Sequence, residues 1–112
     1  MAQAKSHSLN RFHLSADADR DLDEILTYLD QLPLEPGNRI AQSLQSALLT
    51  IAKNPYLGSA NSHLTLLLGE EIRSYLVYPY RIFYRASRTV PEIIAILHGA
   101  RDQSSILGRR FQ

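Results

Sequence analysis

Arginines beside apolar segments are the residues of this chain whose types and spacing could do chemistry. Arg73 and Arg81 lie in runs where polar and apolar residues alternate, and Arg101 follows His98 in the segment HGARD, residues 98–102. Guanidinium groups in such positions could stabilise a phosphate during in-line attack, with His98 or a tyrosine as the acid or base. They could equally bind the carboxylates of an acidic partner protein.

Ion pairing within the fold is a third role open to these arginines. Arg81 could pair with Glu70 or Glu71. Arg101 could pair with Asp102 or with an aspartate of the first helix. Spacing alone leaves three roles open: ion pairing, binding of a protein or peptide, and catalysis.

Most other site chemistries have no support in the sequence. The four histidines are scattered, and no two of them have the spacing that would place two metal ligands on one helix face. The chain has no cysteine, no glycine-rich phosphate loop and no Gly-x-Ser-x-Gly motif. We therefore expect no metal and no cofactor. His98, a lone histidine beside an apolar strand, is expected to be a hydrogen-bonded structural residue.

Hydrophobic periodicity predicts a strand and two helices in the first half of the chain. Residues 10–15 alternate between polar and apolar types, which indicates a short strand. Residues 17–31 and 38–53 each carry an apolar stripe at helical spacing, and a link with two prolines at 32–37 separates them. Two amphipathic helices joined by a short link predict a helical hairpin.

The period changes to two at Ile72. We predict strands at 72–78, 80–85 and 93–97, and the last of these is apolar throughout, as is typical of a strand covered on both faces. Within the middle strand, the alternation places Arg81 on the face opposite its two tyrosines. The three strands should form a meander.

Two segments have a less regular pattern. Residues 56–69 contain glycine, serine and asparagine and predict a loop, although their leucines must be covered by something. Near the C-terminus, Ile106 and Leu107 are expected to dock a short tail against the domain. The residues expected to be loose are Arg109, Arg110 and Gln112.

These elements predict an α+β fold with the order β-α-α-β-β-β. The helical hairpin should pack on a small, mainly antiparallel sheet of three or four strands. Residues 10–108 should form a single domain, preceded by a polar tail at 1–9. The periodicity does not place the first strand within the sheet.

Composition is that of an ordinary globular domain: 45% of the 112 residues are hydrophobic. Residues 1–56 carry five basic and seven acidic side chains, a balance of −2, whereas 57–112 carry seven arginines and four acidic side chains, a balance of +3. A mildly basic half is a soft indication of an acidic partner. No apolar run approaches the roughly 18 residues of a membrane span, so we expect a cytoplasmic protein that does not bind a membrane.

Four segments, in this order, resemble the ParE branch of the ParE/RelE toxin superfamily of bacterial type II toxin–antitoxin modules. They are LSADADRDLDEILTYL, ALLTIAKNPYLG, IRSYLVYPYRIFYR and IIAILHGARD. The resemblance covers roughly residues 10–107. Its ordered motifs are Asn-Pro-x-x-Gly after the second helix, then Tyr-Arg-Ile-x-Tyr, then His-Gly-x-Arg-Asp. It implies the same β-α-α-β-β-β fold that the periodicity predicts.

RelE-type members of this superfamily cleave messenger RNA on the ribosome with lysines, two arginines and a C-terminal tyrosine. The resemblance places Arg81 and Arg101 at the two arginine positions. It places Ile72 and Ser74 at the lysine positions and Leu107 at the tyrosine position. The chain therefore resembles a nuclease that has kept its arginines and lost its acid–base groups.

Characterised members of the ParE branch act on DNA gyrase. The resemblance therefore implies a toxin that inhibits gyrase, is not an enzyme, contributes to plasmid stabilisation and makes no direct contact with nucleic acid. A ParD-like antitoxin with a ribbon-helix-helix N-terminus would neutralise it. One alternative is a RelE-like ribosome-dependent ribonuclease using Arg81 and Arg101 with His98 as a relocated base. Another is a non-toxic family member that acts only as a binding module.

A leucine-rich segment and several arginines are the predicted partner-binding residues. The segment HLTLLL has more leucine than a solvated loop needs, and exposed apolar patches usually mark interaction sites. We expect an apolar groove between the helical hairpin and the sheet that an acidic antitoxin tail fills. The predicted partner-binding residues are Leu64, Leu66, Leu67, Leu68, Arg73, Arg81 and Arg101.

Overall fold

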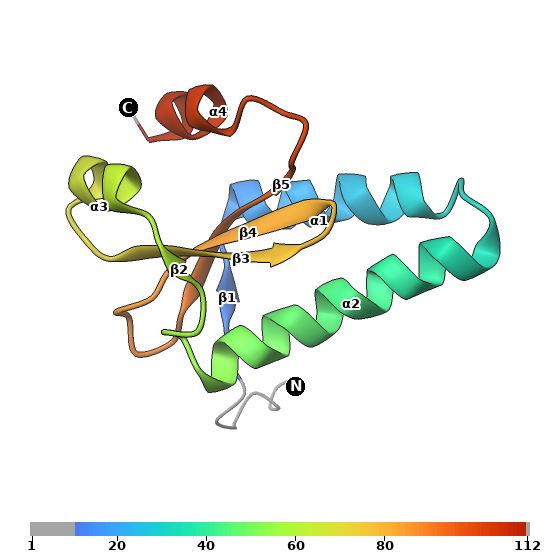
Figure 1. Cartoon of the computed structure of the whole chain (residues 1–112), viewed down its shortest axis with the longest axis horizontal. Helices are drawn as coiled ribbons and strands as arrows, with labels where there is room; N and C mark the ends of the chain where they lie inside the picture. The colour runs from blue at the N-terminus through green and yellow to red at the C-terminus, as the bar shows by residue number, and fades with distance from the viewer. Residues whose placement is uncertain (1–10, 112) are drawn as a thin grey trace.

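A five-stranded sheet with helices on both faces makes up residues 11–111, the part of the chain that the computed structural model describes (Figure 1). The predicted polar tail at 1–9 and the predicted loose Gln112 lie outside these residues. In chain order, the elements are β1 (His13–Leu14), α1 (Ala16–Leu29), α2 (Leu34–Lys53), β2 (Ser59–Ala60), α3 (Ser62–Leu68), β3 (Ile72–Val77), β4 (Tyr80–Arg85), β5 (Glu92–His98) and α4 (Gln103–Arg110).

The sheet has the strand order β1-β5-β4-β3-β2. Strands β3, β4 and β5 form the predicted antiparallel meander, β2 pairs antiparallel with β3, and β1 pairs parallel with β5. The α+β class, the helical hairpin and the mainly antiparallel sheet are thus confirmed. The expected number of three or four strands is wrong, because the two-residue strands β1 and β2 extend the sheet at both edges. The first strand docks beside β5.

Each face of the sheet has its own hydrophobic core. The helical hairpin of α1 and α2 packs on one face, against residues such as Tyr80 and Ile82. Helices α3 and α4 pack on the other face, against Phe83 and Leu97, and Figure 1 shows both on the side away from α2. This arrangement confirms the alternation predicted for β4 and the double coverage predicted for β5.

The two long helices differ from prediction mainly at their ends. Helix α1 begins after Ser15, whose Oγ accepts a hydrogen bond of 3.1 Å from the Ala18 N–H and so caps the helix. Helix α2 begins at Leu34, four residues earlier than expected, with Pro36 in its first turn. A proline is tolerated there because that N–H has no partner within the helix in any case.

Residues 62–68 form helix α3, so the loop predicted for 56–69 is wrong there. The Asn61 side chain caps the helix by accepting a hydrogen bond from the Leu64 N–H, and Gly69 ends it in the left-handed region at φ 75°. Leu64 is buried and Leu68 packs against the same core, whereas Leu66 is 84% exposed. The helix therefore covers half of its leucines and leaves Leu66 and Leu67 at the surface.

The C-terminal residues form helix α4. Asp102 caps it, because its carboxylate accepts hydrogen bonds from the Ser105 N–H and hydroxyl at 3.2 and 2.8 Å. These two bonds hold the pKa of Asp102 below its ordinary value. Ile106 and Leu107 are buried, which confirms the predicted docking of the tail. The prediction that Arg110 is loose is wrong, as described below.

Two motifs noted in the sequence meet in the fold. The Tyr84 hydroxyl donates to the Pro55 carbonyl at 2.7 Å and accepts from the Gly58 N–H at 3.0 Å. A side chain at Gly58 would place its Cβ 2.5 Å from that hydroxyl and 2.6 Å from the Ser74 carbonyl oxygen. The buried tyrosine of Tyr-Arg-Ile-x-Tyr therefore fixes the Asn-Pro-x-x-Gly turn that leads into β2.

Candidate functional site

A cavity of about 390 Å³ opens between the C-terminal half of α1 and the end of β5, beside the turn that joins β3 to β4. We call it the α1–β5 pocket. Most of its exposed lining is apolar. The apolar side chains that form its floor and walls are Ile25, Leu29, Leu32, Ile40, Pro79 and Ile96.

Polar groups lie around this apolar floor. Asp21, Glu24 and Tyr28 line the pocket from α1, and His98 and Arg101 line it from the end of β5. Tyr28 is 53% exposed, so its ring lies at the mouth of the pocket. His98 and Arg101 were predicted from the sequence as candidate site residues, whereas the three α1 residues were not. Their signal was present, since they are three and four residues apart along α1 and so share one helix face.

Tyr80 and His98 form the polar corner of the pocket. Their rings meet edge to face, with centroids 5.4 Å apart and an angle of 84° between planes. The Nδ1 atom of His98 accepts a hydrogen bond of 2.9 Å from the Ala100 N–H, which places the proton of the neutral ring on Nε2. Burial, and to a smaller degree Tyr28, raises the pKa of Tyr80, so its phenol is neutral at pH 7. His98 is thus hydrogen-bonded, as expected for a structural residue.

Arg101 presents a cation at the edge of the pocket. Its side chain is exposed and takes part in none of the ion pairs found within residues 11–111. Pairing of Arg101 with Asp102 or with an aspartate of α1, one of the open roles, does not occur. Asp102 is occupied as the cap of α4, and Asp21 of α1 pairs with a different arginine.

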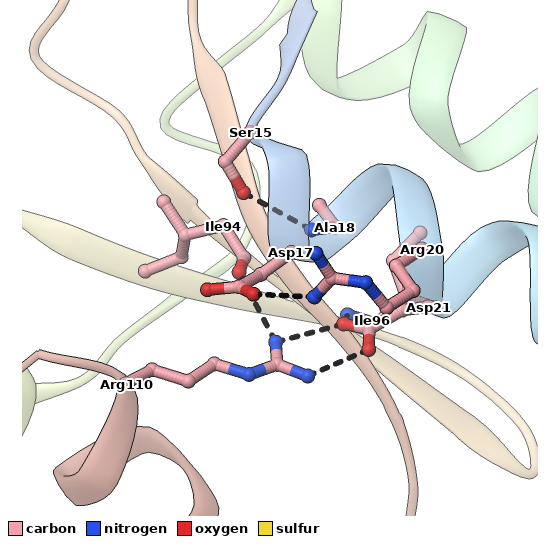
Figure 2. A network of polar contacts seen from close by, with 8 residues as sticks. All are labelled: Ser15, Asp17, Ala18, Arg20, Asp21, Ile94, Ile96 and Arg110. Atoms are coloured by element: carbon pink, nitrogen blue, oxygen red, sulfur yellow. Dashed lines mark hydrogen bonds and ion pairs between the residues drawn. The ribbon is translucent and has the colours of Figure 1, made fainter.

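That arginine is Arg110, which joins α4 to α1 at Asp21, one of the residues that line the pocket. It forms hydrogen bonds of 2.7 and 2.9 Å to the two carboxylate oxygens of Asp21, and Oδ2 of Asp21 also accepts the Ile96 N–H at 2.9 Å. Figure 2 shows Arg110 reaching from α4 to this carboxylate beside β5. The bonds to Asp21 raise the pKa of Arg110. Asp21 lies three residues after Ala18 and four before Ile25, so its place on the buried stripe of α1 was a readable signal.

Arg81 lies on the opposite face of the sheet from His98. It donates a hydrogen bond of 3.1 Å to the Ser74 hydroxyl on neighbouring β3. Pairing with Glu70 or Glu71 does not occur, because those carboxylates precede Ile72, which pairs with Arg85 at the other end of β4. The structure therefore brings His98 and Arg101 together at one pocket and leaves Arg81 outside it.

Arg73 holds the turn before β2. It donates to the carbonyl oxygens of Tyr56 and Gly58 at 3.1 and 2.7 Å and pairs with Glu71 at 2.7 Å. Its guanidinium also lies 5.3 Å from the centre of the Tyr56 ring. These contacts give Arg73 a structural role. Neither Arg73 nor the leucines of α3 line the α1–β5 pocket, which lies on the other side of the sheet from α3.

Comparison with known proteins decides the family. A family model for the ParE toxin of the type II toxin–antitoxin system, parDE, matches residues 12–103. The chain belongs to the ParE toxin family. It is the toxin component of a type II toxin–antitoxin system, and such a system supplies it with an antitoxin partner. A search of curated proteins found no match.

In this ParE-family toxin, the three positions that resemble the catalytic lysines and tyrosine of RelE-type nucleases are inside the protein. Ile72 is fully buried, Leu107 is 1% exposed and Ser74 is 6% exposed. Leu107 belongs to α4, which lies almost entirely beyond the matched residues. Among the described residues, no group of three or more potential metal ligands occurs, and no helix is long and apolar enough to cross a membrane.

Proposed function

We propose that this ParE-family toxin inhibits DNA gyrase, has no ribonuclease activity and is neutralised by a ParD-like antitoxin with a ribbon-helix-helix N-terminus. The observation that carries the proposal is the burial of Ile72, Ser74 and Leu107, the three positions that the resemblance matches to catalytic groups of RelE-type nucleases. Cleavage of RNA through the 2′-hydroxyl needs a base for that hydroxyl and an acid for the leaving oxygen. Acid–base help of this kind contributes about 10²–10⁴-fold to rate.

The arrangement of the retained cations also supports the proposal. Arg81 and Arg101 would both have to contact one phosphate in a nuclease, yet Arg81 lies on the α3–α4 face and Arg101 lines the pocket on the hairpin face. His98 is the remaining candidate base, and its Nδ1 atom is occupied by the Ala100 N–H. A toxin that acts by binding a protein needs none of these groups to converge.

Two assays on the antitoxin-free protein test the proposal. The first measures gyrase-catalysed supercoiling and gyrase-linked DNA breaks, and the second measures cleavage of messenger RNA on translating ribosomes. We expect inhibition in the first and intact messenger RNA in the second. In cells, induced expression should stop DNA synthesis before protein synthesis. The ribonuclease alternative would be supported instead if messenger RNA were cut at codon positions, if the cuts disappeared in His98→Ala or Arg101→Ala, and if gyrase were unaffected.

A further inference from the structure

One stretch of the edge of the sheet has no neighbouring strand. Strand β2 pairs with β3 only at Arg73 and Ser74, so within the part of the chain that the structure describes no strand lies beside the next three residues, 75–77. A cavity of about 430 Å³ opens there, between α2 and β3. We call residues 75–77 the open edge of β3.

The backbone of Leu76 points out of this open edge. At the other end of β3, the Ile72 carbonyl oxygen accepts the Asn61 N–H at 2.9 Å, and the Ile72 N–H donates to the Thr65 hydroxyl at 3.0 Å. Both bonds lie on the side of β3 away from β4. Backbone groups of alternate residues in a strand point to the same side. The N–H and C=O of Leu76, four residues after Ile72, therefore also point away from β4.

Proteins usually protect such an edge with charged side chains, prolines or bulges. The opposite edge of this sheet is protected, because the pair of Asp21 and Arg110 takes backbone groups of β5. The open edge has no such device: its residues are Tyr75, Leu76 and Val77, and their register with β4 is regular. The Leu76 side chain is 55% exposed. This stretch can therefore accept an added strand.

Charge on α2 indicates which strand fits. The α2 side chains that line the cavity extend from Arg39 to Thr50 on one helix face. Glu35 lies on this face four residues before Arg39, and Lys53 lies on it three residues after Thr50. Lys53 is exposed and takes part in none of the ion pairs found within residues 11–111. Glu35 contacts Arg39 at 3.4 Å through one oxygen and is 83% exposed, so its other oxygen can accept a second cation.

We propose that the open edge of β3 pairs with the same edge of a second copy of this chain. A two-fold axis beside Leu76 joins the two β3 strands antiparallel, and each Leu76 donates and accepts one backbone hydrogen bond. Helix α2 runs alongside β3 in roughly the opposite direction (Figure 1), so the same axis sets the two α2 helices antiparallel.

This arrangement matches the charges on α2. Glu35 of one copy faces Lys53 of the other, because the two residues lie at nearly equal distances from the middle of the lining stretch. Arg39 lies beside the last turn of the α2 helix of the second copy, where the negative end of the helix dipole favours a cation. The pairing goes beyond the toxin function and does not depend on gyrase being the target.

Sedimentation equilibrium of the antitoxin-free toxin at pH 7 tests the pairing. The open edge is short, so we expect a weak dimer with a dissociation constant on the order of 10–100 µM. Leu76→Lys introduces a charge of the kind that protects natural edges and should raise this constant about 10-fold or more. Leu66→Lys makes the same change at an exposed leucine of α3 and should stay within about threefold of wild type.

Charge reversal tests the contact between the two α2 helices. Glu35→Lys and Lys53→Glu should each raise the dissociation constant about fivefold at low salt, since two such pairs form in each dimer. The effect should shrink at about 1 M salt. The double variant Glu35→Lys/Lys53→Glu exchanges the two charges and should return the constant to within about twofold of wild type, which independent effects of the two changes would not do.

An engineered disulfide tests the register. The chain has no cysteine, so Leu76→Cys carries a single thiol. Residues opposite one another in a hydrogen-bonded antiparallel pair have Cα atoms about 5.5 Å apart, which a disulfide can span. Mild oxidation should convert Leu76→Cys to a covalent dimer and leave the control Leu66→Cys monomeric.

Three results would overturn the proposal. The first is a monomer at every concentration up to about 500 µM. The second is a dimer whose dissociation constant is unchanged in Leu76→Lys, which would place the contact on another surface. The third is the absence of cross-linking in Leu76→Cys. If the toxin is monomeric and Leu76→Lys instead weakens binding of the antitoxin, the open edge belongs to a strand of that partner and not to a second copy.

Discussion

Arg110 and Asp21, 89 residues apart in the sequence, are joined by two hydrogen bonds of 2.7 and 2.9 Å. The contact links the last helix to the first and lies where the two-residue strand β1 has already ended. Beyond the end of β1, the Asp21 carboxylate accepts a hydrogen bond from the Ile96 N–H, and Arg110 donates a longer one of 3.5 Å to the Ile94 carbonyl oxygen. The pair therefore satisfies backbone hydrogen-bonding groups along the part of the β5 edge that β1 does not cover.

Arg110→Ala should destabilise the protein by about 2–4 kcal/mol. The substitution leaves the Asp21 carboxylate, 7% exposed, with a single neutral donor, and breaking a buried pair costs more than the pair contributes when intact. The measurement is the free energy of unfolding in urea at pH 7. Arg20→Ala is the matched control, since it removes an exposed arginine from Asp17 and should cost less than about 1 kcal/mol. Equal losses in the two variants would contradict this role for Arg110.

The element types were readable from the sequence wherever the hydrophobic pattern was long. The stripes of α1 and α2 and the alternation of β3 and β4 depend on local spacing alone. Helix α3 is only seven residues long, and its capping residue Asn61 lies among glycine and serine residues that are typical of loops. Helix α4 is polar on most of its surface, and the contact of Arg110 with Asp21 of α1 holds its last turn. Because this contact joins residues far apart in the sequence, no local pattern predicts it.

Gly58→Ala should destabilise the protein by about 3 kcal/mol or more. The new methyl group would meet the Tyr84 hydroxyl and the backbone of Ser74, so the strain would add to the loss of a buried hydrogen bond. Gly108→Ala is the control. That glycine lies within α4, and a methyl group added there would have no neighbour within 4 Å, so alanine should be neutral or stabilise by about 0.5–1 kcal/mol. Thermal unfolding of both variants distinguishes a steric cause from a general intolerance of alanine.

Glu70 should make stability depend on pH in the acid range. Hydrogen bonds and ion pairs with Arg88, and then Arg85, hold the pKa of Glu70 below its ordinary value of 4.5. A carboxyl whose pKa is lower in the folded state stabilises the fold above the unfolded value, and this contribution is lost as pH falls through the folded value. Glu70→Gln should therefore cost about 1 kcal/mol at pH 7, a value limited by solvent screening.

The difference between wild type and Glu70→Gln should shrink below pH 4.5 and vanish in strong acid. Urea unfolding at a series of pH values measures it. Glu35→Gln serves as the comparison, because it removes a carboxylate from an exposed pair with Arg39 and should have little effect at any pH. If the difference in unfolding free energy between wild type and Glu70→Gln stayed constant from pH 7 to pH 3, the predicted contribution of Glu70 to the pH dependence of stability would be contradicted.

Individual residues of the candidate site were predictable from the sequence, but their arrangement around one pocket was not. Strand parity placed Arg81 opposite Tyr80 correctly. It gave no indication that α1 supplies one wall of a pocket whose other wall is the end of β5. The register of β5 is also irregular, since Phe83 pairs with Ala95 but Tyr84 pairs with Ile93. A bulge of this kind changes which side chains share a face, and simple alternation does not reveal it.

Arg81→Ala should affect stability and leave the toxin's activity intact. Its side chain donates to the largely buried Ser74 hydroxyl and lies on the face away from the α1–β5 pocket, so removal should cost about 1 kcal/mol of unfolding free energy. Gyrase inhibition by the antitoxin-free variant should stay within about threefold of wild type once the folded fraction is matched, since the residue's main contact is structural. Ribosomes incubated with wild type or variant should yield the same uncut messenger RNA. Ser74→Ala removes the acceptor alone and should reproduce the loss of stability. If Arg81→Ala instead abolished a measurable messenger RNA cleavage while Ser74→Ala retained it at equal stability, Arg81 would be acting on RNA, and the ribonuclease alternative would hold.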